Sequence, residues 1–143
     1  MTRPIAAAVV TFAVVVALSV SLAGEKSQPA QEWKLIGKFG IIRTVYVSPD
    51  GLKDKFFVAQ VLHALVTKED SSKPIQLMMF DDVRFTPQGF PMTDAQMLHL
   101  KAQYNKNPNT KHERFVWISV TDSKSSPPGL KETEAPIRPG YAE

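Results

Sequence analysis

A stretch of six residues, Ile75–Phe80 (IQLMMF), sets the strongest limit on the architecture of this 143-residue chain. The run is almost entirely apolar and lacks the polar alternation of a strand that has one face in water. Such a run is typical of a strand buried on both faces. We therefore expect it at the centre of a sheet.

Two further strands are expected, one on each side of this run along the chain. Residues 39–47 are rich in β-branched and aromatic residues, which favour a strand. This strand can reach back to Trp33 if a bulge forms at Gly37 or Gly40. Residues 114–120 alternate in side-chain type with a period of two, so they predict the third strand.

Two helices are expected between the strands. Residues 53–67 carry apolar side chains at helical spacing. Thr93 can cap a second helix, with Gln96 reaching back to complete a capping box. That helix is predicted over residues 93–104, and Pro108 prevents it from continuing.

The resulting order, β-α-β-α-β, predicts a small single α/β or α+β domain over residues 33–122, with a three-stranded sheet and two helices. The connection from residue 48 to residue 74 is long enough for a crossover, so the first two strands should run parallel. Residues 24–32 form a polar spacer. Residues 123–143 are rich in proline and poor in apolar residues, and we expect this tail to stay extended and disordered.

The N-terminal residues 1–23 have the pattern of an export signal. Arg3 precedes an apolar run over residues 5–22, and Ser21 and Ala23 occupy the small-residue positions before a cleavage site. The run is also long enough to remain as an uncleaved membrane anchor. Both alternatives place the domain outside the cytoplasm, either periplasmic or extracellular after export or held at the inner membrane, because the positive charge precedes the apolar run.

Composition excludes several classes of function. The chain has no cysteine, which rules out disulfides, thiol catalysis and a lipid-modified cysteine. Nucleic-acid binding needs a concentrated basic face, and a formal net charge of only +3 gives no indication of one. Nucleic acid is therefore not an expected partner. The sequence contains none of the common serine-hydrolase, zinc-protease or phosphate-loop motifs.

Aspartates follow the predicted strands and are the candidate metal ligands. Asp50 follows the first strand, Asp81 and Asp82 follow the second, and Asp122 follows the third. If the strand ends meet at one edge, these oxygens would suit Mg²⁺ or Ca²⁺. The alternative is that the carboxylates only cap turns, in which case no cofactor is expected.

His99 is the candidate acid or base. It lies on the second predicted helix, next to Leu98. If this part of the helix stands near the sheet edge, His99 could form a proton-transfer pair with Asp81 or Asp82. The alternative is an ordinary surface histidine.

The loop from Phe80 to Met97 is the candidate binding segment. A turn at residues 86–89 reverses the chain, and Phe85 and Phe90 lie beside it. These rings could form an exposed patch for a protein partner or a small apolar ligand. The alternative is a structural joint in which Phe90 and Met92 pack back onto the second helix.

From these features we expect a non-catalytic binding or accessory domain, exported or membrane-anchored, that acts through the Phe80–Met97 segment. The alternative is a metal-assisted enzyme or ion-binding domain that uses Asp81 and Asp82.

Overall fold

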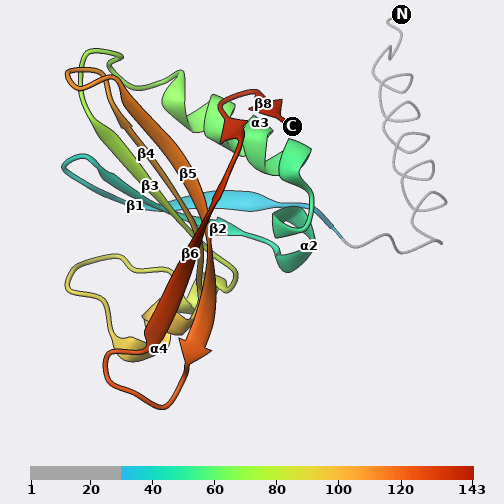
Figure 1. Cartoon of the computed structure of the whole chain (residues 1–143), viewed down its shortest axis with the longest axis vertical. Coiled ribbons are helices and arrows are strands. Elements are labelled where there is room, and N and C mark those ends of the chain that lie inside the picture. The colour runs from blue at the N-terminus through green and yellow to red at the C-terminus, as the bar shows by residue number, and fades with distance from the viewer. Residues whose placement is uncertain (1–29) are drawn as a thin grey trace, which may run out of the picture.

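The computed structural model describes residues 30–143 (Figure 1). The predicted signal or anchor, residues 1–23, and the first part of the spacer, residues 24–29, lie outside the described residues. Within residues 30–143, no helix is long and apolar enough to cross a membrane.

A six-stranded sheet dominates the fold, so the predicted three-stranded sheet with two helices is wrong. The strands follow one another across the sheet in sequence order, and only β2 and β3 pair in parallel. Their bounds are β1 Trp33–Phe39, β2 Ile42–Val47, β3 Ile75–Phe80, β4 Leu100–Asn107, β5 His112–Asp122 and β6 Gly129–Ala135. A second, two-stranded sheet consists of β7 Ile137–Arg138 and β8 Tyr141–Ala142.

The helical elements are short and belong to the connections. They are α2 Pro49–Leu52, α3 Lys55–Val66, the 3-10 turn η1 Val83–Phe85 and α4 Asp94–Leu98. Ser48 caps α2, and Asp54 caps α3 by accepting hydrogen bonds from the first backbone amides of the helix. α2 and α3 form the crossover between β2 and β3. The two strands pair in parallel, which confirms the predicted direction.

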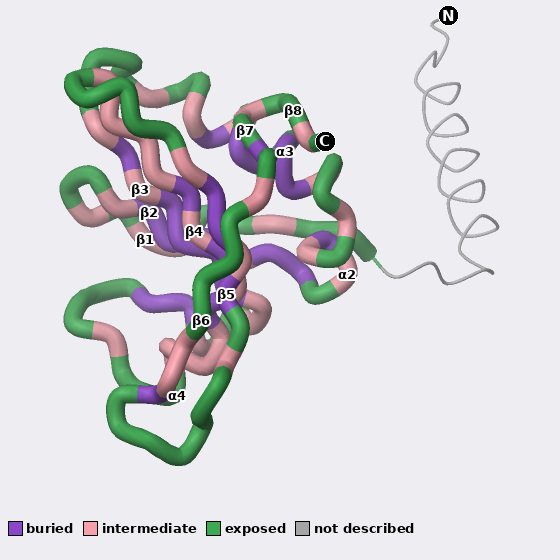
Figure 2. The backbone as a smooth tube through the Cα atoms, viewed as in Figure 1, coloured by how far each residue is buried: buried purple, intermediate pink, exposed green. Residues whose placement is uncertain are grey.

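The core has two parts, one on each face of the sheet. The face covered by α3 buries one cluster of strand and helix residues, and the opposite face buries a smaller cluster beneath the Phe80–Met97 segment. β3 contributes Leu77 and Met79 to the first cluster and Met78 and Phe80 to the second, which confirms a strand buried on both faces. Figure 2 shows the buried residues concentrated in α3 and the central strands.

The predicted strand over residues 39–47 is split into a hairpin. Gly40 adopts a positive φ of 58° and turns the chain between β1 and β2, a conformation that glycine reaches at little cost. The register of β1 shifts between Leu35 and Gly37, so a bulge is present but centres on Ile36. β1 thereby becomes an edge strand of its own.

Only the first part of the predicted helix over residues 93–104 forms. The Thr93–Gln96 capping box forms as expected, but α4 ends at Leu98 and the following residues form β4. Leu100, Ala102 and Tyr104 are buried at every second position, which is the period of a strand. Pairing with both β3 and β5 outweighs the weak helical pattern here.

The tail, residues 123–143, also differs from expectation, because it carries β6, β7 and β8. β6 is mostly polar yet pairs with β5 through backbone hydrogen bonds, which do not require apolar side chains. Beyond it, Ile137 is buried in the cluster under α3, and the Gly140 amide donates to the Ala59 carbonyl at 2.8 Å. A few well-placed contacts therefore hold a segment of disorder-like composition.

Candidate functional site

Asp81 and His99 form a pair where β3 ends and β4 begins. The Asp81 amide donates to the His99 carbonyl at 3.1 Å, and Asp81 Oδ1 lies 2.7 Å from His99 Nδ1. Lys101 Nζ lies 4.0 Å from the other carboxylate oxygen of Asp81. The carboxylate orients the imidazole through its Nδ1, as in many pairs used for proton transfer.

Phe85 holds the same imidazole from a second direction. Its ring stacks on His99 with centroids 4.4 Å apart and planes 9° apart. The structure thus brings together three of the predicted site residues, Asp81, Phe85 and His99. Phe90 lies apart from them, with its ring edge-on to Phe39 at a centroid distance of 5.3 Å.

Asp82 serves the loop that contains it. Its carboxylate caps η1 by accepting from the Arg84 amide at 2.9 Å, and it pairs with the Arg84 guanidinium at 2.7 Å. These hydrogen bonds to Arg84 lower the pKa of Asp82 to about 2. Both oxygens are therefore already engaged.

The other two candidate metal ligands lie on different elements from Asp81 and Asp82. Asp50 lies in the first turn of α2, and Asp122 accepts hydrogen bonds from the Lys124 and Ser125 amides in the turn after β5. Within residues 30–143, no three histidine, cysteine, aspartate or glutamate side chains lie close enough together to hold one metal ion. The structure does not gather the four aspartates into a cation site.

The Phe80–Met97 segment runs alongside the β1–β2 hairpin, on the face of the sheet opposite α3. Val83 lines a hollow with Tyr46 near one end of the hairpin, while Phe90 contacts Phe39 near the other. Between them, the Thr44 hydroxyl donates to the Pro87 carbonyl at 2.7 Å in a buried hydrogen bond. The segment is thus attached to the hairpin through Pro87 and Phe90 and does not project freely.

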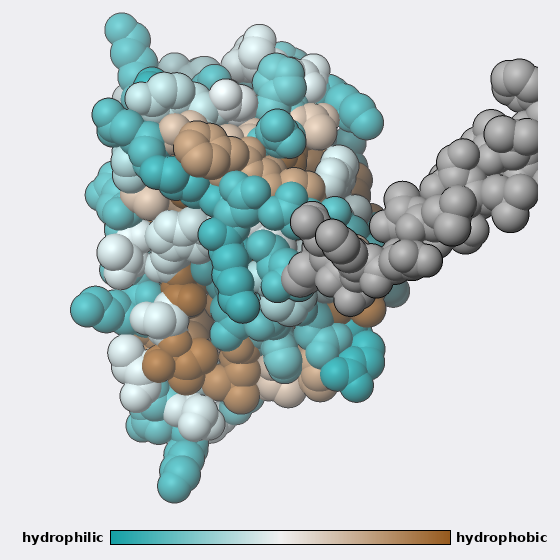
Figure 3. All heavy atoms as spheres, turned by 90° about the vertical axis from the view of Figure 1, so that its right-hand side faces the viewer, coloured by the Kyte–Doolittle hydropathy of each residue, from teal (hydrophilic) through white to brown (hydrophobic). Residues whose placement is uncertain are grey.

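Val83 and Phe90 nevertheless face solvent, with 48% and 42% of their surfaces exposed. Phe85, which the sequence predicts in one patch with Phe90, is only partly exposed because it covers His99. In Figure 3, hydrophobic residues on the face in view form separate patches among hydrophilic ones. Exposed apolar side chains on a fixed segment are the feature here most suited to a contact surface.

Replacing Thr44 with valine should release the segment without changing the volume of the side chain much. The substitution leaves the Pro87 carbonyl without its buried donor, so we expect the free energy of unfolding to fall by about 1–2 kcal/mol. Hydrogen exchange should accelerate at the amides of residues 81–92 more than in β3. If the substitution accelerated exchange equally in both regions, or in neither, the anchoring role of Thr44 would be contradicted.

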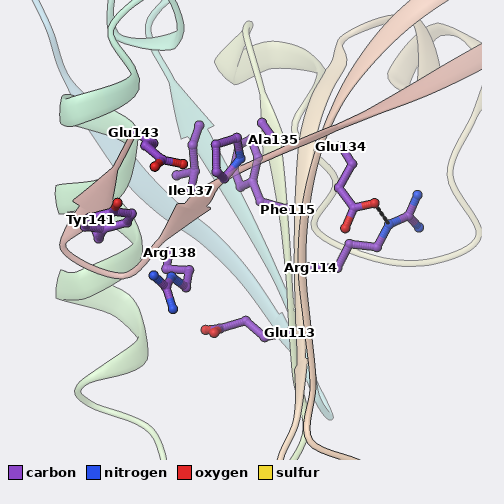
Figure 4. Close-up of a pocket in the computed structure, with 10 residues that line it drawn as sticks. Glu113, Arg114, Phe115, Glu134, Ala135, Ile137, Arg138, Tyr141 and Glu143 are labelled. Atoms are coloured by element: carbon purple, nitrogen blue, oxygen red, sulfur yellow. Dashed lines mark ion pairs between the residues drawn. The ribbon is translucent and has the colours of Figure 1, made fainter.

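A larger hollow, of about 410 Å³, lies between β5 and the β7–β8 sheet (Figure 4). Several of its charged groups have partners within the protein. The Tyr104 hydroxyl donates to Glu113 at 2.5 Å, and Arg138 lies over the Tyr141 ring, 4.9 Å from its centroid. Burial and the Glu113 carboxylate raise the pKa of Tyr104, so its hydroxyl keeps its proton. We regard this hollow as part of the attachment of the tail.

Comparison with known protein families, curated proteins and solved structures gives no match. Function must therefore be argued from the arrangement of the residues described above.

Proposed function

We propose that this protein is a small exported or membrane-anchored binding domain without a catalytic role, and that its Phe80–Met97 segment contacts a protein partner. One observation carries the proposal. A buried hydrogen bond from Thr44 to the Pro87 carbonyl fixes the segment on the sheet, and yet Val83 and Phe90 remain exposed on it. Export or anchoring rests on the apolar pattern of residues 1–23.

The fixed backbone supports a role in binding. A surface that is already ordered loses little conformational entropy when a partner docks, so more of the contact energy appears as affinity. The Thr86 hydroxyl donates to the Asp82 carbonyl at 2.9 Å, and the Thr93–Gln96 capping box closes the other end of the segment. Phe90 would act as an aromatic anchor in a pocket of the partner.

The surroundings of the Asp81–His99 pair support a structural role for it. Within the described part of the chain, Asp81 is the one side chain hydrogen-bonded to the His99 ring, and no hydroxyl group bonds to that ring. Asp81, which precedes η1, and Phe85, the last residue of η1, both contact the His99 ring, so they tie η1 to the start of β4. We assign the pair to the positioning of the segment.

Photo-crosslinking of the full chain in its host cells tests the proposal. A benzophenone amino acid would replace Phe90 in one variant and Phe56 in a control, because Phe56 is 59% exposed but lies on α3. We expect one discrete protein adduct from position 90, none of that mass from position 56, and a weaker adduct when Val83→Asp is added. Identical adducts from both positions, or none from position 90, would contradict the proposal.

A further inference from the structure

A hollow of about 300 Å³ opens beside α2, on the side of the sheet edge where β2 and β3 end. The carboxyl ends of parallel strands are a common place for ligands in open α/β sheets. The hollow is small for a ligand pocket, which favours a small ligand. Its lining residues are Pro49, Leu52, Lys53, Asp81, Lys101, Trp117 and Ile118.

One wall of this hollow, which we call the α2 pocket, is apolar and rigid. Leu52 comes from α2, and Trp117 comes from β5, and both pack against the cluster on the α3 face of the sheet. Ile118, the next residue of β5, is buried in the cluster on the opposite face, so its side chain is not part of this wall. The Trp117 indole is fixed edge-on against Phe115, with centroids 4.9 Å apart and planes 80° apart. A half-buried indole beside the aliphatic side chain of Leu52 suits an alkyl chain or a single ring.

The charges of the α2 pocket leave one cation uncompensated. Lys101 donates to the Leu98 carbonyl at 3.0 Å and lies 4.0 Å from Asp81, which is itself bonded to His99. Lys101 and Asp81 therefore offset each other. Lys53 is exposed and forms no ion pair with any residue between 30 and 143.

We infer that the α2 pocket binds a small amphipathic carboxylate, with its head group at Lys53 and a short alkyl chain along Leu52 and Trp117. The inference goes beyond the proposed function, because it needs no protein partner and does not involve the exposed Val83 and Phe90 side chains. Each methylene buried in the pocket should lower the dissociation constant about fourfold until the pocket is full.

Fluorine NMR of the full chain in lipid nanodiscs provides the test. The chain has two tryptophans, so labelling with 5-fluorotryptophan gives two resonances, which Trp33→Phe assigns. Butyrate, hexanoate and octanoate should shift the Trp117 resonance saturably, with tighter binding as the chain lengthens. Trp33 lies outside the pocket, so its resonance should stay in place and report any general effect of the added compound.

Two comparisons separate a specific site from simple partitioning. Hexanol has the chain but not the charge, so it should not produce the saturable shift. Lys53→Ala should weaken hexanoate binding about fivefold, while Lys73→Ala, at an exposed lysine outside the pocket, should leave it unchanged. The inference fails if no carboxylate shifts Trp117 saturably, if hexanol matches hexanoate, or if the two lysine variants behave alike.

Discussion

Replacing Phe80 with alanine is expected to lower the free energy of unfolding by about 3–5 kcal/mol. Phe80 is fully buried in the cluster beneath the Phe80–Met97 segment. The substitution removes a large apolar side chain and leaves a cavity that the surrounding strands can fill only in part. Because a domain of this kind is stabilised by about 5–15 kcal/mol in all, the loss would be severe.

Chemical denaturation of the full chain measures this effect, with Phe56→Ala as the matched control. Phe56 is 59% exposed on α3, so the same chemical change there should alter the free energy of unfolding by about 0.5 kcal/mol or less. Equal losses for the two variants would show that the cluster under the segment is not a core. That result would also remove the support for a segment fixed on the sheet.

Glu69→Ala is expected to lower the free energy of unfolding by about 2–3 kcal/mol at pH 7. The Arg43 guanidinium is nearly buried on β2 and donates to both carboxylate oxygens of Glu69, at 2.8 and 2.9 Å. Removing the carboxylate leaves a buried charge unpaired, which costs about 3–5 kcal/mol in fully buried pairs. The loss should be smaller here because the Glu69 side chain is 25% exposed.

The same pair predicts a pH dependence that Glu69→Gln can isolate. Hydrogen bonds from Arg43 lower the pKa of Glu69 below its usual 4.5. The stabilisation from the charged form is therefore complete above pH 4.5 and is lost as the pH falls through the lowered pKa of the folded protein. In thermal unfolding, the melting temperature of the wild type should exceed that of Glu69→Gln at pH 7. The two melting temperatures should converge in acid. A gap that persists to low pH would contradict this assignment.

The candidate site could be predicted in its residue types but not in its geometry. The sequence predicts a pair between His99 and either Asp81 or Asp82, and the structure selects Asp81, whose Oδ1 lies 2.7 Å from His99 Nδ1. The role of Phe85 as a cover for His99 was missed, since nothing in the local sequence indicates stacking. The α2 pocket was also missed, because Lys53 and Trp117 come from elements 64 positions apart that meet only through the sheet.

The parts of the fold that local chemistry specifies were predicted well. The apolar run of β3, the helical stripe of α3 and the Thr93–Gln96 capping box each depend on side chains within a few positions of one another. Such signals are present in the chain before it folds. They can be interpreted without knowing which distant residues contact them in the folded protein.

β4 and β6 depend on residues that are far away in the sequence, whereas β5 follows the local alternation of residues 114–120. β4 forms because β3 and β5 offer hydrogen-bonding partners on both sides, and β6 forms because the outer edge of β5 is open to a polar strand. Backbone pairing leaves only a weak trace in side-chain type, so the local pattern predicted a helix in one place and disorder in the other. The long-range hydrogen bonds of the sheet settled both.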